Sequence, residues 1–143
     1  MREILFKAKR KDNGEWVVGD LSQHKNGKKF IKAGSATHSF EVNAFTICQY
    51  TGLTDKNGNK IWENDVVKKH FYTDYDAYAN SDEYVGFVKY EDFAWVIKSP
   101  KGKMIRTFPI IEAIAYSKDV KYFEVIGNVF DNPKLMKEGG EDV

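Results

Sequence analysis

The chain has 143 residues, of which 42% are hydrophobic and 15% aromatic, and its formal net charge is +1. This length fits one domain or two small ones, and the aromatic content excludes a disordered chain. The near balance of 22 basic and 21 acidic residues argues against a protein that binds nucleic acid through a large net positive charge.

The first elements are predicted by alternation of apolar and polar residues. Ile4, Phe6 and Ala8 share one face of a strand, and Asn13-Gly14 is typical of a tight hairpin turn. Residues 3–21 therefore predict a β-hairpin. A second turn at 25–28 leads into a further short strand.

The middle of the chain carries a strand, a turn cluster and another strand. Apolar residues between Phe40 and Tyr50 predict a strand near 45–51. Residues 55–60 are a dense cluster of turn formers, and Val66 opens the next strand.

The C-terminal half predicts a meander of short strands at 84–90, 92–97, 104–108 and 122–130. Alternation places Phe93 on the same face of its strand as Trp95 and Ile97. Residues 109–121 are compatible with a helix or a strand, and Pro133 with a short helical turn. Five aromatic residues are expected in the core: Phe6, Trp16, Phe87, Trp95 and Phe123.

A shift in composition near residues 49–53 predicts the domain organisation. Residues 1–50 form an N-terminal β-hairpin part, residues 51–138 a small β-barrel part, and residues 139–143 a flexible tail. The expected fold class is mainly β, with at most short helical turns.

No targeting or membrane segment is predicted, because no apolar stretch suits a signal peptide or the ~20 residues of a membrane span. We therefore expect a cytoplasmic protein. Cys48 is the single cysteine and cannot form an internal disulfide, so a small buried hydrophobe is its simplest interpretation.

Two blocks of opposite charge lie behind the balanced total. Residues 1–32 hold nine basic and four acidic side chains, a balance of +5, and residues 72–92 hold six acidic and one basic, a balance of −5. Solvated strand edges, a phosphate-binding face and a head-to-tail contact between copies all fit this pattern.

These blocks supply two sets of candidate contact residues. Aromatic and acidic residues in a long excursion suit a protein contact: Tyr72, Asp74, Tyr75, Asp76, Tyr78 and Tyr84. Lysines of the basic block are candidate phosphate contacts: Lys7, Lys9, Lys11, Lys28 and Lys29.

Catalytic and metal-binding signatures are weak. The acidic residues from Asp74 to Asp82 lack the glycine and glutamate of a calcium loop, because Ala79 and Val85 occupy those positions. The three histidines are isolated, and no glycine-rich phosphate cradle follows a strand. We expect no cofactor, no metal and no enzymatic activity.

Two long motifs, Gln49–Gly58 running into Ile61–Val67, and Phe123–Pro133, resemble the YopX family of phage and prophage proteins. The opening residues 2–4 and residues 16–21 extend the resemblance over nearly the whole chain. The resemblance implies a β-rich architecture whose C-terminal part is an SH3-type barrel, in a phage or prophage of a bacterial host. It supplies no catalytic residue.

The chain departs from the family pattern at one turn, where Glu63-Asn64-Asp65 stands in place of the common Glu-Gly-Asp. We interpret the motif residues as mainly structural, with a site lined by some of them as the alternative. They are Gln49, Gly52, Asp55, Asn57, Gly58, Asp65, Gly127, Asn128, Asn132 and Pro133.

The expected function is therefore a non-catalytic protein-interaction module, with another protein or a second copy as partner. A small nucleic-acid-binding β-barrel that uses the basic N-terminal part is the alternative.

Overall fold

The computed structural model describes residues 3–34, 37–69, 84–101, 104–107 and 123–137. The chain divides into two compact units, Met1–Tyr50 and Thr51–Val143. The predictions for residues 70–83, for the block at 109–121 and for the tail at 139–143 lie outside the described residues.

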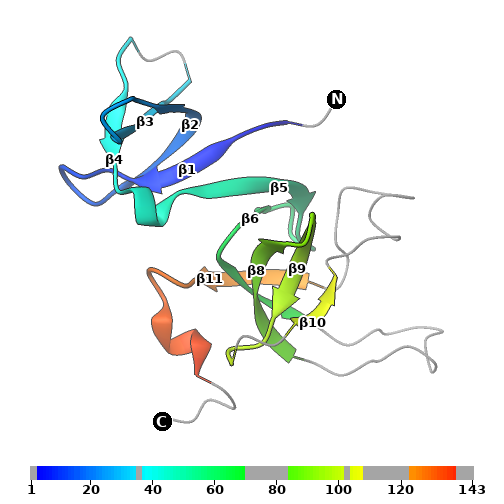
Figure 1. Ribbon diagram of the computed structural model, residues 1–143. Coiled ribbons are helices and arrows are strands. Elements are labelled where there is room, and N and C mark those ends of the chain that lie inside the picture. Colours follow the sequence, from blue (N-terminus) through cyan, green and yellow to red (C-terminus); the bar gives the residue numbers. More distant parts are fainter. Residues whose placement is uncertain (1–2, 35–36, 70–83, 102–103, 108–122, 138–143) are drawn as a thin grey trace. The chain divides into compact units, whose positions relative to one another are not determined.

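The N-terminal unit is an antiparallel meander of four strands (Figure 1). They are β1 (Phe6–Lys9), β2 (Trp16–Gln23), β3 (Lys29–Lys32) and β4 (Phe40–Val42). Gly14 has a φ of 74° in the β1–β2 turn, a left-handed conformation that glycine adopts at little cost. The predicted first hairpin is thus confirmed.

Backbone contacts also join the end of β1 to β4. The Lys11 N–H donates to the Glu41 carbonyl at 3.0 Å, and the Asn43 N–H donates to the Lys9 carbonyl at 2.8 Å. Four buried side chains, one from each strand, form the core of this unit: Ala8, Val17, Ile31 and Val42.

The strand predicted near 45–51 begins later than expected. Residues Ala44–Thr46 form a short 3-10 helix, η1, and β5 covers Cys48–Thr54. The Asn43 side chain accepts the Phe45 N–H at 3.0 Å, and Thr46 Oγ1 accepts the Lys9 N–H at 2.9 Å. These side-chain bonds favour a turn over an extended backbone.

The C-terminal unit contains a five-stranded antiparallel sheet in the order β10-β9-β8-β7-β11. Its strands are β7 (Asp65–Lys69), β8 (Tyr84–Glu91), β9 (Ala94–Lys98), β10 (Met104–Thr107) and β11 (Phe123–Asn128). The short strand β6 (Lys60–Trp62) precedes β7, and the 3-10 helix η2 (Pro133–Met136) follows β11.

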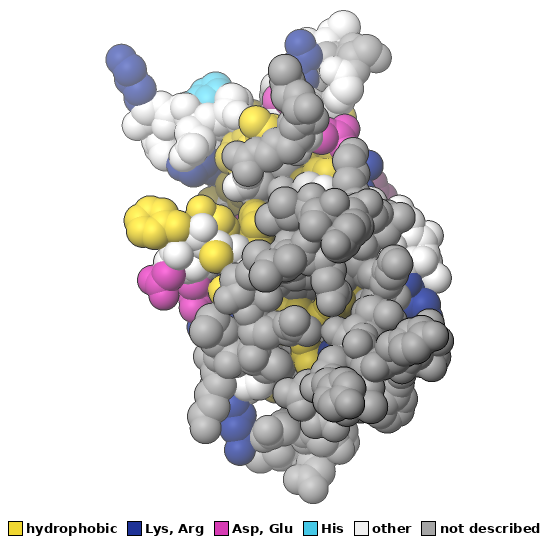
Figure 2. Space-filling model, turned by 90° about the vertical axis from the view of Figure 1, so that its right-hand side faces the viewer, with side chains coloured by type: hydrophobic (Ala, Val, Ile, Leu, Met, Phe, Trp, Pro, Cys, Tyr) yellow, Lys and Arg dark blue, Asp and Glu magenta, His cyan; other side chains and the backbone are white. Residues whose placement is uncertain are grey.

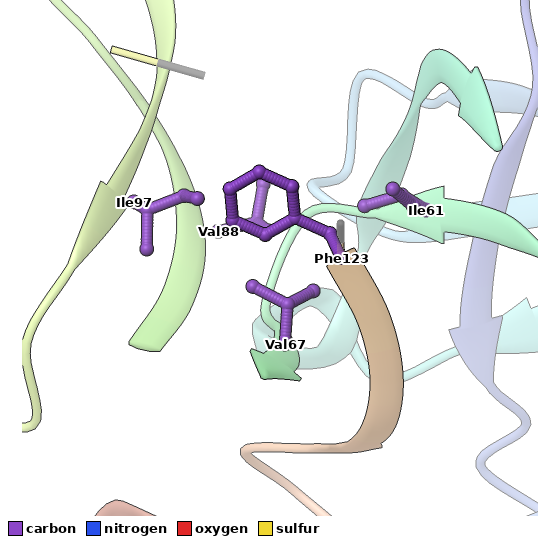
Figure 3. Close-up of a cluster of buried hydrophobic side chains, with 5 residues drawn as sticks. All are labelled: Ile61, Val67, Val88, Ile97 and Phe123. Carbon is purple, nitrogen blue, oxygen red and sulfur yellow. The ribbon is translucent and has the colours of Figure 1, made fainter. Parts of the chain in front are cut away.

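The core of this unit is a cluster of five side chains that come from five different strands: Ile61, Val67, Val88, Ile97 and Phe123. In Figure 3 the Phe123 ring lies among the four aliphatic side chains. Each of the aliphatic residues is fully buried. Because β6 and four strands of the sheet (β7, β8, β9 and β11) contribute, their burial ties these strands together.

The fold is mainly β, as predicted, and the helical structure among the described residues is limited to η1 and η2. The described strands do not form a closed barrel. Of the aromatic residues expected in the core, Phe123 is buried, and Phe6 and Trp95 are partly buried against the two clusters. Trp16 and Phe87 are only half-buried, with Trp16 beside two lysines of β1, and Phe93 lies in the β8–β9 turn.

Candidate functional site

Asp55, the central acidic residue of the first motif, is buried in the β5–β6 turn, with 1% of its surface exposed. Its Oδ1 accepts the N–H groups of Asn57 and Asn59, both at 2.9 Å. Its Oδ2 accepts the Val125 N–H from β11, also at 2.9 Å. One carboxylate thus closes its own turn and fixes that turn to a strand 70 residues away.

The pKa of Asp55 reports the balance of two effects. Burial disfavours the charged carboxylate, but the three backbone N–H groups outweigh burial and lower its pKa below the ordinary value. A carboxylate held in this way is fully engaged by its own chain, which suits a structural role better than a ligand contact.

The Glu63-Asn64-Asp65 turn contains a residue in the left-handed conformation. Asn64 has a φ of 70°, where glycine is favoured and asparagine is among the best-tolerated alternatives. Its N–H donates to the Val88 carbonyl and its carbonyl accepts the Val129 N–H. Asp65 Oδ2 accepts the Trp62 N–H at 2.8 Å. Asn64 therefore holds a backbone conformation that glycine usually provides.

The second motif places β11 tightly against the chain that follows it. A Cβ atom at Gly127 would overlap the Asn132 side chain and come within 2.9 Å of Leu135 Cδ1. Asn132 Oδ1 accepts the Asn128 N–H, rather than capping η2. Asn128 Oδ1 in turn accepts the Phe130 N–H.

The remaining motif residues lie at strand and turn positions. Gln49 is paired with Phe6 in β1, and Gly52 and Gly58 have φ values of 89° and 83°. Pro133 is the first residue of η2. The described motif residues thus take part in strand pairing, in turns and in the start of η2.

The five candidate phosphate contacts lie at three places in the N-terminal unit. Lys7 and Lys9 lie on one face of β1, with their Nζ atoms 4.6 Å and 5.4 Å from the Trp16 ring centroid. Lys11 forms an ion pair with Glu41 at 3.2 Å. Lys28 and Lys29 lie at the start of β3, where Lys29 Nζ donates to the Gly27 carbonyl.

Of the tyrosine-rich excursion, Tyr84 is the one candidate contact residue that the structure describes. Its ring packs edge-on against Phe123, with centroids 6.3 Å apart. Tyr84 therefore belongs to the packing around the core. Tyr72, Asp74, Tyr75, Asp76 and Tyr78 lie outside the described residues.

The β8–β9 hairpin carries three aromatic side chains at and beside its turn: Tyr90, Phe93 and Trp95. Glu91 pairs with Ala94, so Asp92 and Phe93 form a two-residue turn. Phe93 is 94% exposed at its tip. One pair before the turn, Tyr90 and Trp95 stack edge-on with centroids 5.0 Å apart.

The backbone of this turn is strained for its residue types. Asp92 and Phe93 both have positive φ values, 50° and 66°, as in the type I′ turn that favours Asn-Gly or Asp-Gly. A left-handed conformation costs a residue with a side chain roughly 1–2 kcal/mol. Phe93 occupies the glycine position of such a turn, and its exposed ring gains almost no burial in return.

Exposed apolar side chains also occur elsewhere in the described chain. Phe45 in η1 is 90% exposed, and Ile4 is 58% exposed. On the face of the molecule drawn in Figure 2, hydrophobic side chains reach the surface beside charged and polar ones. Phe93 differs from Phe45 in its positive φ.

The described residues form neither an exposed cysteine site nor a cluster of metal ligands. Cys48 is buried, and its Sγ lies 3.3 Å from the Thr46 carbonyl, to which it donates. No group of three His, Cys, Asp or Glu side chains that could hold a metal was found in the part of the chain that the structure describes. Within that same part, no helix has the length and apolarity to cross a bilayer.

Comparison with known proteins places the chain in a family. The YopX protein family matches residues 5–137. The chain belongs to the YopX family. Among solved structures, this YopX protein is similar to protein EF1440 from Enterococcus faecalis, with 22% sequence identity and a TM-score of 0.49. The likeness covers 96% of this chain and 100% of that one. No curated protein matches the YopX chain.

Proposed function

We propose that this YopX protein is a non-catalytic protein-interaction module, and that the β8–β9 hairpin is its anchor. The observation that carries the proposal is Phe93, which is 94% exposed at a backbone position that disfavours it. Strained residues persist where the surrounding structure holds them, and they concentrate at functional sites.

The neighbouring side chains suit a protein partner. Tyr90 is 51% exposed and stacks on Trp95, so an aromatic surface continues from the turn into the hairpin. Aromatic residues are enriched in protein interfaces because they bury a large area with few rotatable bonds. The ion pair between Glu91 and Lys98 at 2.6 Å gives this surface a polar edge.

The tyrosine-rich excursion directly precedes β8, and we propose that it widens the same contact. The charge of residues 72–92 supports a partner that presents basic side chains to it. Replacing Tyr75 and Tyr78 by serine then weakens partner capture.

The wider setting is also a proposal. The resemblance to phage and prophage proteins supports action in the cytoplasm of a bacterial host. For the C-terminal unit we propose the SH3-type barrel, because β11 returns to pair with β7, the first strand of the meander.

The test compares two single substitutions, Phe93→Ser and Phe45→Ser, in quantitative affinity capture from host cells. Both remove an exposed phenylalanine ring. Serine at position 93 keeps the strained turn, whereas it removes the proposed anchor. We expect Phe93→Ser to lower the yield of the captured partner at least tenfold and Phe45→Ser to leave it unchanged.

Equal capture by the wild type and by Phe93→Ser would overturn the proposal. Light scattering of the purified protein decides between partners: a dimer that Phe93→Ser converts to a monomer identifies a second copy of this chain. If the wild type and Phe93→Ser are both monomers, the captured partner is a different protein.

A further inference from the structure

We propose that the outer face of β1 and β2 binds single-stranded nucleic acid, with Trp16 stacking on a base and Lys7 and Lys9 contacting the flanking phosphates. This site lies in the N-terminal unit and is independent of the β8–β9 hairpin. It sharpens the nucleic-acid alternative from a block of charge to a defined group of side chains.

The register of the two strands creates the site. Lys9 is directly opposite Trp16, and Lys7 is opposite Val18. Side chains alternate along a strand, so these four residues share the face opposite to the buried Ala8 and Val17. Val18 is 41% exposed, so the apolar surface continues beside the indole.

The two lysines keep positive charge at the indole ring. Their Nζ atoms lie 4.6 Å and 5.4 Å from its centroid, within the range of cation–π attraction. A base that stacks on the indole takes the place of these ammonium groups at the ring, and the two lysines then contact the phosphates on either side of that base. Single-strand binders combine the same two elements, an aromatic platform and a basic track.

The charge of the unit favours a polyanion. Residues 1–50 contain nine basic and five acidic side chains, a balance of +4, whereas residues 51–143 have a balance of −3. Among these carboxylates, Asp12 is engaged by Arg10 at 2.6 Å and Glu41 by Lys11 at 3.2 Å. The acidic residue next to Trp16 is Glu15, which accepts a hydrogen bond from Asn13.

A single strand fits this face better than a duplex or an acidic protein. A duplex hides its base faces, and an acidic peptide engages the lysines without needing the indole. The proposal therefore depends on the Trp16 indole beside the ammonium groups of Lys7 and Lys9. The test must separate base stacking on the indole from attraction between the lysines and the phosphates.

The experiment measures fluorescence anisotropy of labelled oligothymidylate of about 15 nucleotides, the upper end of the site sizes known for small β-domains. A strand of equal length with abasic sites carries the same phosphates. We expect Trp16→Leu to weaken binding of oligothymidylate about tenfold, as the loss of one stacked base predicts. Affinity for the abasic strand stays unchanged.

The double variant Lys7→Gln/Lys9→Gln tests the phosphate contacts. It should weaken binding of both strands and reduce the slope of log affinity against log salt by about 1.4, since each single-strand phosphate contact contributes about 0.7. The matched control, Lys56→Gln/Lys134→Gln, removes the same charge from exposed positions of the C-terminal unit and should leave the slope unchanged.

If Trp16→Leu fails to fold, Trp16→Tyr keeps an aromatic platform and assigns the Trp16 indole signal in the NMR spectrum of the wild type. That signal should shift on titration with oligothymidylate. Equal affinity of the wild type for the normal and abasic strands, or an unmoved indole signal, would overturn the proposal. Equal binding of polyglutamate would point instead to an acidic protein surface and would also overturn it.

Discussion

The β5–β6 and β8–β9 turns belong to the same unit but differ in whether their residues suit the backbone conformation of the turn. In the first, Asp55, Asn57 and Gly58 are residues that turns favour, and the carboxylate is buried and bonded on both oxygens. In the second, Phe93 stands at a positive φ and its ring is almost fully exposed.

The difference separates residues that maintain the fold from the residue that we propose as the contact with a partner. Asn64 sharpens the contrast, because it also has a positive φ but is only 8% exposed and accepts a hydrogen bond from Lys89 at 3.0 Å. Positive φ is thus compensated by internal bonds at Asn64. At Phe93 almost the whole ring faces solvent, and we attribute its retention to a contact with a partner.

The largest expected effect is at Asp55. Replacing it by alanine leaves three N–H groups without the acceptor they have now, one of them in β11. We expect Asp55→Ala to lower the free energy of unfolding by at least about 3 kcal/mol, given roughly 1–3 kcal/mol for each buried N–H group that loses its acceptor. Urea denaturation measures this, and a loss below about 1 kcal/mol would contradict the structural role.

The next effect is at Gly127, where a methyl group has no room beside Asn132. We expect Gly127→Ala to cost about 1–3 kcal/mol, as overpacking does elsewhere. The double variant Gly127→Ala/Asn132→Ala removes one of the overlapping groups and should lose less stability than the two single losses added together. Additive losses would show that the two sites are independent.

The pH dependence of stability follows from the lowered pKa of Asp55. A carboxyl group whose pKa is lower in the folded state stabilises the fold above its unfolded-state pKa of about 3.9, and this contribution is lost as pH falls through the folded-state value. The stability difference between the wild type and Asp55→Asn should therefore be constant from about pH 5 upward and shrink in more acid solution. A difference that stays constant in acid would be inconsistent with this assignment.

Much of the fold could be predicted because alternation and turn chemistry are local signals. The β1–β2 hairpin follows from Ile4, Phe6 and Ala8 on one side and from Asn13-Gly14. The η1 turn could not be predicted from the apolar residues alone, because it depends on side-chain bonds from Asn43 and Thr46. The bond from Val125 to Asp55 joins positions 70 residues apart, so no local pattern contains it.

The candidate site was less predictable. The alternation that placed Phe93 with Trp95 and Ile97 fails because Asp92 and Phe93 form the turn itself. The sequence did contain a sign of this turn, because Asp92 separates two apolar segments that can pair as a hairpin. The glycine that usually marks such a turn is missing. Trp16 was expected in the core because it is large and apolar, whereas its register opposite Lys9 places it on the outer face.

The measurement that tests this account most directly is the effect of Phe93→Gly on stability and on partner capture in the same protein preparation. Glycine restores the Asp-Gly pair that a type I′ turn favours, so the free energy of unfolding should rise by up to about 1.5 kcal/mol, which is the left-handed strain relieved less the entropy that glycine adds to the unfolded chain. Capture of the partner should be lost. A variant that is less stable than the wild type, or that still captures the partner, would contradict the claim that Phe93 is kept for binding at the expense of stability.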